Sequence, residues 1–364
     1  MSRRPARTAT LLAVGGLLAT ALTSCAAGAS DRPGAVLDGI RARQQAGSAV
    51  TPPPAASAST CTSPVPDEAS YPGLASVPST LPAGSLEAAI KQRGYLVVGV
   101  SGDTRLLGAR DRLTEADPAG FDIDVARAIG RAILGPNARI VFKVITSAQR
   151  FPQVNLGVDH DGVDLVARAV SMTCARWAAT VTDPATATGS AFSVAYLSSD
   201  QRVLVRTSEQ ADNLDALIKA RQKAVPGSTV KVCAPSPSTS LDKIRTISGV
   251  TPVPVSLHSD CLALWQEGRV DAITGDDVIL AGFLAQDSTA RILPGTRLGT
   301  TPYGLAIARA HPEFVRYVNA VMATAQFRAA WQQAYDTNLA KALVDAPKVL
   351  PPPVESRPLP GTGG

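Results

Sequence analysis

The chain has 364 residues, 4% of them aromatic, and a formal net charge of +5. Arg3, Arg4 and Arg7 carry three of the positive charges, and removing residues 1–24, which hold no acidic residue, lowers the charge to +2. A charge this small, without a basic stripe interleaved with aromatic residues, argues against nucleic-acid binding. The three histidines are scattered and no CxxC pair occurs, so we expect no metal and no cofactor.

The first 24 residues have the pattern of a signal peptide. An apolar run over residues 9–22 follows the charged start and is too short for a comfortable membrane span. The run ends in Leu22-Thr23-Ser24-Cys25, which resembles the lipobox of bacterial lipoproteins, in which Cys25 becomes the acylated N-terminus. An ordinary signal peptide with a chance cysteine is the alternative. We therefore predict a protein anchored by lipid at the extracytoplasmic face of a bacterial plasma membrane.

Two proline-rich segments flank the rest of the chain. Residues 25–85 are rich in Ala, Ser, Pro and Gly and predict a flexible tether, because such a composition buries little apolar surface. Residues 346–364 contain a second run of three prolines and predict a flexible tail.

Strand and helix patterns alternate between residues 86 and 345. The first apolar strand covers residues 95–100, and Asp122 can cap a helix over residues 123–134, where apolar residues recur every four positions. Further strands are expected at 139–145, 164–167, 201–206, 228–233, 253–255, 272–274 and 291–293. The alternation predicts an α/β protein with mostly parallel sheets, and about 260 residues suggest two lobes.

A series of short motifs follows these elements in a characteristic order. They are RGYLVVGV (93–100), GFDIDVA (120–126), GVDLV (162–166), SMTCAR (171–176), FSVAY (192–196), SPSTS (236–240), GRVDA (268–272), DD (276–277) and YGLA (303–306). Their order and spacing resemble the polar-amino-acid (glutamate/glutamine-type) group of bacterial extracellular solute-binding proteins, which serve ABC transporters. The match runs over most of residues 90–340.

The resemblance implies the type II periplasmic-binding-protein-like fold, with two lobes joined by a hinge of two crossing segments. Residues 86–196 and 298–345 would form lobe 1, and residues 197–297 would form lobe 2. The ligand would lie in the cleft between the lobes, which closes by hinge bending.

The resemblance also implies which residues hold the ligand. A buried amino acid needs a cation for its carboxylate and an anion for its ammonium. Arg176 suits the carboxylate because guanidinium donates two parallel hydrogen bonds, and Ser171 and Thr173 come from the same motif. Asp276 follows an apolar strand and would accept the ammonium. A plain helix cap is the alternative role for Asp276, and Asp277 is the alternative carboxylate.

Two further loops are candidates for ligand contacts. Ser238 and Thr239 lie at a strand-to-helix turn whose backbone amides can hold a carboxylate, but Pro237 replaces the family's glycine and removes one donor. In the loop after the first strand, Asp103 is placed for an amide or the ammonium and Arg105 for a side-chain carboxylate. The alternatives are a plain turn and solvated loop charges.

The cysteines suggest two disulfides. If Cys25 carries lipid, four cysteines remain, and an even number is typical of an exported protein. Four cysteines allow three pairings. Within the implied lobes, Cys233 ends a strand and Cys261 begins a helix of lobe 2, so we expect Cys233–Cys261. Cys61–Cys174 then joins the tether to lobe 1.

These observations predict a monomeric binding lipoprotein rather than an enzyme. The expected ligand is glutamate or aspartate, then glutamine or asparagine, delivered to an ABC permease. A lipoprotein that senses the same ligand for a membrane receptor is the alternative. A dehydratase on the same fold would need an acid or base in the cleft, and no paired carboxylate and histidine lie near the ligand motifs. A scaffold that binds nothing is the third alternative, because of Pro237.

Overall fold

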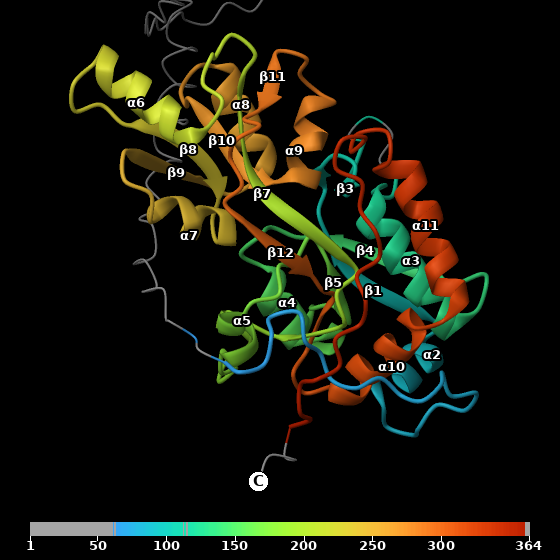
Figure 1. The fold of residues 1–364 in the computed structure, drawn as a ribbon. Coiled ribbons are helices and arrows are strands. Elements are labelled where there is room, and N and C mark those ends of the chain that lie inside the picture. Colours follow the sequence, from blue (N-terminus) through green and yellow to red (C-terminus); the bar gives the residue numbers. More distant parts are fainter. Residues whose placement is uncertain (1–60, 62, 112, 114–115, 361–364) are drawn as a thin grey trace, which may run out of the picture. The chain divides into compact units, whose positions relative to one another are not determined.

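The computed structural model describes residues 61, 63–111, 113 and 116–360 (Figure 1). The predicted signal peptide, Cys25 and most of the tether lie outside these residues. Within the described part, no helix is long and apolar enough to cross a membrane.

The first sheet has five strands in the order β4-β1-β5-β13-β6. β1 pairs in parallel with β4 and β5, whereas β13 runs antiparallel to β5 and β6. The strands are β1 (Tyr95–Val100), β4 (Arg139–Val144), β5 (Leu165–Ala167), β6 (Ala191–Phe192) and β13 (Ala306–Ile307). The helices that accompany this sheet are α2 (Leu86–Arg93), α3 (Phe121–Leu134), α4 (Arg150–Leu156), α5 (Cys174–Ala178), α10 (Pro312–Met322) and α11 (Ala325–Asn338). The 3-10 helices η1 (Val158–His160) and η2 (Pro184–Thr186) and the hairpin of β2 (Asp103–Thr104) and β3 (Gly108–Ala109) complete this part.

The second sheet has six strands, with β11-β7-β10-β8-β9 in order and β12 beside β7. β8 is parallel to β9 and β10, whereas β7 is antiparallel to its three neighbours. The strands are β7 (Leu197–Arg206), β8 (Val230–Pro235), β9 (Val250–Val255), β10 (Ala272–Asp276), β11 (Ala290–Ile292) and β12 (Gly299–Tyr303). The helices are α6 (Leu214–Ala224), α7 (Thr239–Arg245), α8 (His258–Gln266) and α9 (Asp277–Leu284).

The two-lobed α/β fold expected from the sequence is confirmed, with each sheet mixed rather than mostly parallel. The strands that run antiparallel to their neighbours are β7 and β13, which lie at or next to the crossovers between the sheets. β7 and β12 run side by side between the two sheets (Figure 1), with Leu197 paired to Tyr303 and Gln201 to Gly299. The sequence assigns residues 298–345 to lobe 1, whereas residues 299–303 pair with β7 in the second sheet.

The start of α3 differs from the sequence prediction. Gly120, not Asp122, occupies the N-cap, with φ of 139° and a backbone so close to Leu107 that a Cβ would lie 2.4 Å from its carbonyl oxygen. The position therefore requires glycine. Asp122 is 1% exposed and accepts hydrogen bonds from Tyr196 Oη and the Ala169 amide, both at 2.8 Å. A buried carboxylate needs such partners, which is why it turns inward instead of capping the helix.

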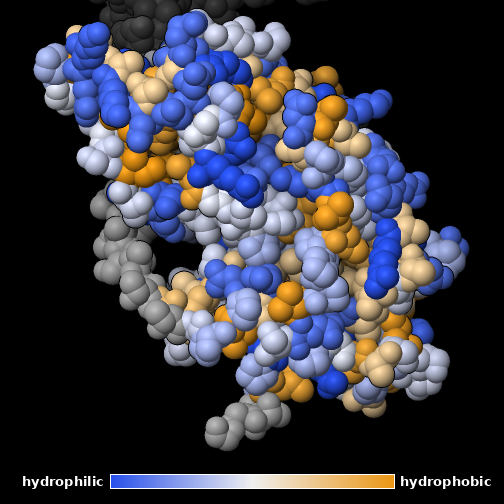
Figure 2. Space-filling view, in the orientation of Figure 1, coloured by the Kyte–Doolittle hydropathy of each residue, from blue (hydrophilic) through white to orange (hydrophobic). Residues whose placement is uncertain are grey.

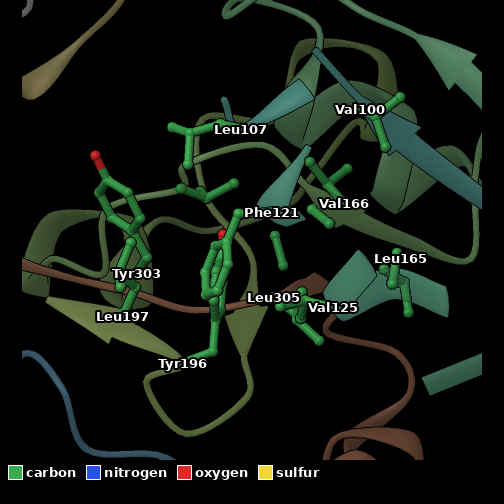
Figure 3. Close-up of a cluster of buried hydrophobic side chains, with 14 of the residues drawn as sticks. Val100, Leu107, Phe121, Val125, Leu165, Val166, Tyr196, Leu197, Tyr303 and Leu305 are labelled. Atoms are coloured by element: carbon green, nitrogen blue, oxygen red, sulfur yellow. The ribbon is translucent and has the colours of Figure 1, made fainter. Parts of the chain in front are cut away.

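The core beneath the first sheet also reaches the hinge. Phe121 and Val125 of α3 meet strand residues of β1 and β5 (Figure 3). Tyr196 and Tyr303, one from each crossing segment, join the same cluster with ring centroids 6.3 Å apart. On the surface, hydrophobic residues form separate patches among hydrophilic ones on the face in Figure 2.

The described parts of the predicted tether and tail form hydrogen bonds that a flexible segment was not expected to make. Residues 63–85 and 346–360 bond to each other and to the body. The Ser70 amide donates to the Val354 carbonyl at 2.8 Å, and buried Asn319 donates to Ser70 Oγ at 2.9 Å. Composition could not predict these hydrogen bonds, because the partner residues lie far away in the chain.

Candidate ligand-binding site

Arg176 lies on α5, a helix of five residues that follows the Ser171 motif. Thr173 caps this helix, and its Oγ1 accepts the Arg176 amide at 3.3 Å. The Arg176 guanidinium donates to the Ser171 carbonyl at 2.6 Å and lies 5.3 Å from the centre of the Phe151 ring. Burial lowers the pKa of Arg176 to about 10, although Asp242 and Asp276 oppose that shift. Arg176 is thus held by one backbone carbonyl and one aromatic ring.

Asp276 ends β10 and is 5% exposed. Its Oδ2 accepts a hydrogen bond from Tyr303 Oη, while its Oδ1 is buried without a hydrogen-bond partner among the described residues. Burial raises the pKa of Asp276 to about 6, and Asp277 adds to that rise. Arg176 and Arg150 act in the opposite direction. A buried carboxylate oxygen without a partner is costly, and it marks a place where a donor belongs.

The neighbouring Asp277 has different surroundings. Its Oδ1 accepts from Ser199 Oγ and from the Val278 amide, and its Oδ2 accepts from Lys348 Nζ at 2.5 Å. Both oxygens therefore already have protein partners. This difference supports Asp276 as the ligand carboxylate.

The turn before α7 meets the first lobe. Ser238 caps α7, and its Oγ accepts the Leu241 amide at 3.1 Å. Thr239 Oγ1 lies 3.3 Å from Ser171 Oγ, so these two predicted residues are brought together. Pro237 lacks an amide hydrogen, but its carbonyl accepts a hydrogen bond from Arg150 at 3.0 Å.

The two remaining candidates, Asp103 and Arg105, lie in the loop after β1 and differ in their surroundings. Asp103 accepts hydrogen bonds from Ser101 Oγ at 2.9 Å and from the Ser259 amide at 3.0 Å. Its carboxylate therefore already has protein partners, and Arg168 lies 3.7 Å away. Arg105 is exposed, and its backbone carbonyl packs against Gly282. The structure does not bring Arg105 together with Arg176 and Asp276.

Three residues near the site were not predicted: buried Arg150 and Arg168, and half-buried His258. Arg150 is 5% exposed and donates to the Ser147 and Pro237 carbonyls at 2.9 and 3.0 Å. Burial lowers its pKa well below the ordinary value, and the charges of Arg176 and Arg168 add to this shift. Arg150 and Arg168 follow the ends of β4 and β5, and the carboxyl ends of strands are the sheet edge where ligands bind. That position was the available sequence signal.

Arg168 and His258 each keep a buried nitrogen without a hydrogen-bond partner among the described residues. These atoms are Nη2 of Arg168, which lies 3.7 Å from Asp103, and Nδ1 of His258. Burial, together with the charge of Arg168, lowers the pKa of His258 to about 3, so the imidazole is neutral at pH 7.

The charges of this cluster do not balance within the protein. Arg168 faces Asp103, but within the described part Arg150 and Arg176 form no ion pair. The anionic side has one unpartnered oxygen, on Asp276. The cluster therefore offers two unpaired cations and one incompletely paired anion.

Both expected disulfides are present in the structure. Cys61 is bonded to Cys174 and Cys233 to Cys261, with Cα–Cα distances of 5.7 and 5.5 Å. The described residues include no group of His, Cys, Asp and Glu arranged to hold a metal ion.

The fold and the motifs define a solute-binding protein. The sequence profile of the bacterial extracellular solute-binding proteins, family 3, matches residues 96–341, and the chain belongs to this family. Membership of this family implies an extracytoplasmic location.

Two relatives and one solved structure illustrate the similarity. The ABC transporter glutamine-binding protein GlnH of Bacillus subtilis (strain 168) is 29% identical over 234 residues, 64% of this chain and 77% of that protein. The glutamate-binding protein GluB of Corynebacterium efficiens is 25% identical over 258 residues, 68% of this chain and 80% of that protein. The cysteine-binding protein of Campylobacter jejuni superposes with a TM-score of 0.59 at 16% identity, covering 73% of this chain and 100% of that one. Both relatives are named as binding proteins rather than enzymes.

Proposed function

We propose that this protein is a lipid-anchored receptor that binds an acidic amino acid and delivers it to an ABC permease. Glutamate and aspartate are the first candidates, followed by glutamine and asparagine. The relatives named for glutamine and glutamate support an amino-acid ligand. The lipid would be attached at Cys25.

The unbalanced charge cluster is the observation that carries this proposal. An acidic amino acid brings two carboxylates and one ammonium, which complement two unpaired guanidiniums and one carboxylate. Arg176 takes the α-carboxylate with Ser171, and Asp276 takes the α-ammonium through its unpartnered Oδ1. Arg150 replaces the exposed Arg105 as the partner of the side-chain carboxylate. Burying a charge without its partner is costly, so the ligand would complete the site.

The ligand would also hold the two lobes together. Arg176 and Arg150 come from helices beside the first sheet, whereas Asp276 ends a strand of the second. Contacts already join these parts at Arg150 and Pro237 and at Ser171 and Thr239. A ligand that touches both sides binds the closed form better than the open one, and this difference in affinity drives closure.

A thermal-shift screen of the purified protein against the twenty amino acids tests the proposal. A ligand at 100 times its Kd adds about 2.7 kcal/mol to the free energy of unfolding, so glutamate and aspartate should raise Tm most. A response restricted to basic or aliphatic amino acids would reject the acidic ligand. If none of the twenty raises Tm, the receptor function itself is wrong.

A further inference from the structure

α5, the helix that carries Arg176, is too short to be stable by itself. It has five residues, and isolated helices need about 12–15 residues before they are even marginally stable in water. The Arg176 carbonyl accepts hydrogen bonds from the Ser190 amide at 3.1 Å and from Arg309 at 2.9 Å. These contacts hold one side of the helix, and its first turn needs separate support.

That support comes from the amino-terminal segment, defined as residues 61 and 63–71. The disulfide to Cys61 is made by Cys174, the first residue of α5. Asp67 Oδ1 accepts the Cys174 amide at 2.6 Å, while Thr173 Oγ1 accepts the Arg176 amide. Two of the free amides at the helix start are therefore satisfied by side chains, one from the N-cap Thr173 and one from Asp67, which is 107 positions away in the sequence. The negative charge of Asp67 at this helix start is also favourable.

Segments from both ends of the chain then enclose Trp177, the residue after Arg176. The Trp177 indole donates to the Asp67 carbonyl at 3.2 Å, and its ring meets Tyr71 edge-on at 5.5 Å. The Arg357 guanidinium lies 4.0 Å from the centre of the Trp177 ring. Trp177 is 4% exposed, so these contacts bury it and hold α5 through the residue that follows Arg176.

We propose that the amino-terminal segment is part of the ligand-recognition apparatus, with Asp67 as a positioning residue for Arg176. This inference rests on the proposed function, because it concerns the arginine assigned to the α-carboxylate. Two parallel hydrogen bonds to a carboxylate require a fixed guanidinium orientation. The Ser171 carbonyl and the Phe151 ring hold the guanidinium, and the position of the Arg176 backbone decides whether it reaches them. Asp67 does not touch the ligand and acts only through α5.

Calorimetric titration with L-glutamate tests this role. Asp67→Ala removes a capping side chain, so its Kd for L-glutamate should be about 2- to 30-fold higher than that of the parent. Asp67→Asn keeps an oxygen acceptor for the Cys174 amide and should bind almost like the parent. Asp183→Ala is the matched control, because Asp183 caps a different helix, accepting the Ala185 amide at the start of η2. It should change Kd by less than about twofold.

The same substitution in an Arg176→Lys background separates positioning from a general structural role. A lysine has no fork to orient, so Asp67→Ala should then cost less than about twofold in Kd. Where Arg176→Lys binds too weakly for calorimetry, thermal shifts at millimolar L-glutamate give the same comparison. Equal losses in both backgrounds, or parental binding by Asp67→Ala, would overturn the inference.

The outcomes also separate this inference from the proposed function. If the parent does not bind L-glutamate, the amino acid with the largest thermal shift replaces it as the probe. Parental binding by Arg176→Lys would show that the assigned carboxylate site is wrong. Strong loss by Arg176→Lys together with parental binding by Asp67→Ala would reject only the positioning role.

Discussion

Arg150 is almost fully buried, yet its hydrogen bonds go to two backbone carbonyls and not to a carboxylate. A guanidinium in this position loses hydration without gaining an ion pair, and that cost has to be offset elsewhere. The nearby Arg176 raises the cost further, because two cations repel each other. A ligand with two carboxylates offsets both at once, whereas a neutral side chain leaves Arg150 unpaired.

Arg150→Met should therefore change ligand preference as well as affinity. Removing one member of a buried charge pair costs about 2–5 kcal/mol, or about 30-fold to several thousand-fold in Kd for L-glutamate. L-Glutamine should lose much less, because its amide makes no ion pair. Calorimetry with both ligands measures the ratio. Arg105→Met is the control, since Arg105 is exposed, and it should bind both ligands like the parent. An unchanged ratio in Arg150→Met would contradict the assignment.

The raised pKa of Asp276 predicts a pH dependence. The ligand-free carboxyl takes up a proton as pH falls through about 6, and the protonated form cannot pair with an ammonium. A bound ammonium favours the ionised form, so binding below that pH expels a proton. Affinity for L-glutamate should fall by up to about tenfold for each unit below pH 6 and stay level above about pH 7.

The stability of the ligand-free protein should change in the opposite direction. The pKa of Asp276 is about 6 in the folded state and near the ordinary 3.8 in the unfolded chain, so the folded state binds more protons between these values. Stability therefore rises as pH falls through about 6 and stays level below the unfolded-state pKa. Burial also raises the pKa of Asp122 to about 6, so both groups contribute. Binding measurements on Asp276→Asn across this pH range separate Asp276 from Asp122. This variant should bind L-glutamate weakly, and its affinity should lack the step near pH 6. A parental step in Asp276→Asn would assign it to another group.

The candidate site was predictable in part. Arg176, Ser171 and Asp276 belong to motifs with fixed local spacing, so their positions could be read from the sequence. Arg150, Arg168 and His258 belong to no such motif, and they meet only because strand ends and α8 converge in space. Arg105 was predicted from its charge and its place in the loop. Its backbone packs against α9 and its side chain is exposed, and no local sequence pattern signals this packing.

At the scale of elements, the predicted tail forms a buried ion pair through Lys348 that its proline-rich composition did not suggest. Lys348 donates through Nζ to Asp277 at the start of α9, and its amide donates to Tyr335 Oη of α11 at 3.0 Å. The Lys348 and Asp277 side chains are 12% and 7% exposed. Through the ion pair and the amide hydrogen bond together, Lys348 links α9 beside the second sheet to α11 beside the first.

Lys348→Met should destabilise the protein because it leaves Asp277 buried without its cation. Breaking a buried ion pair by removing one partner costs about 3–5 kcal/mol, which urea unfolding would detect as a lower midpoint. Lys341→Met, on an exposed position of the same chain end, should leave the midpoint unchanged. Adding Asp277→Asn to Lys348→Met should recover part of the loss. An unchanged midpoint in Lys348→Met would show that this contact contributes nothing.

Prediction of the elements succeeded where the signal was local. β1 is an apolar run of six residues, four of the six residues of β4 are apolar, and α3 repeats its apolar face over about four turns. β6 and β13 have two residues each, which is too short for any periodicity. They are strands only because each finds a partner more than a hundred positions away. β12 was missed for the same reason, since its identity depends on pairing with β7.

At the scale of the whole molecule, the route of the chain sets the order in which its sheets can be completed during synthesis. β13 lies between β5 and β6 in the first sheet, but it is made only after every strand of the second. Until Ile307 emerges, β5 has one edge without a partner, and all three of its residues are ones that the finished fold buries. Open, apolar strand edges favour pairing with other chains. The growing polypeptide therefore passes through a long interval in which the open edge of β5 is prone to aggregation, and chaperones would protect the chain most during that interval.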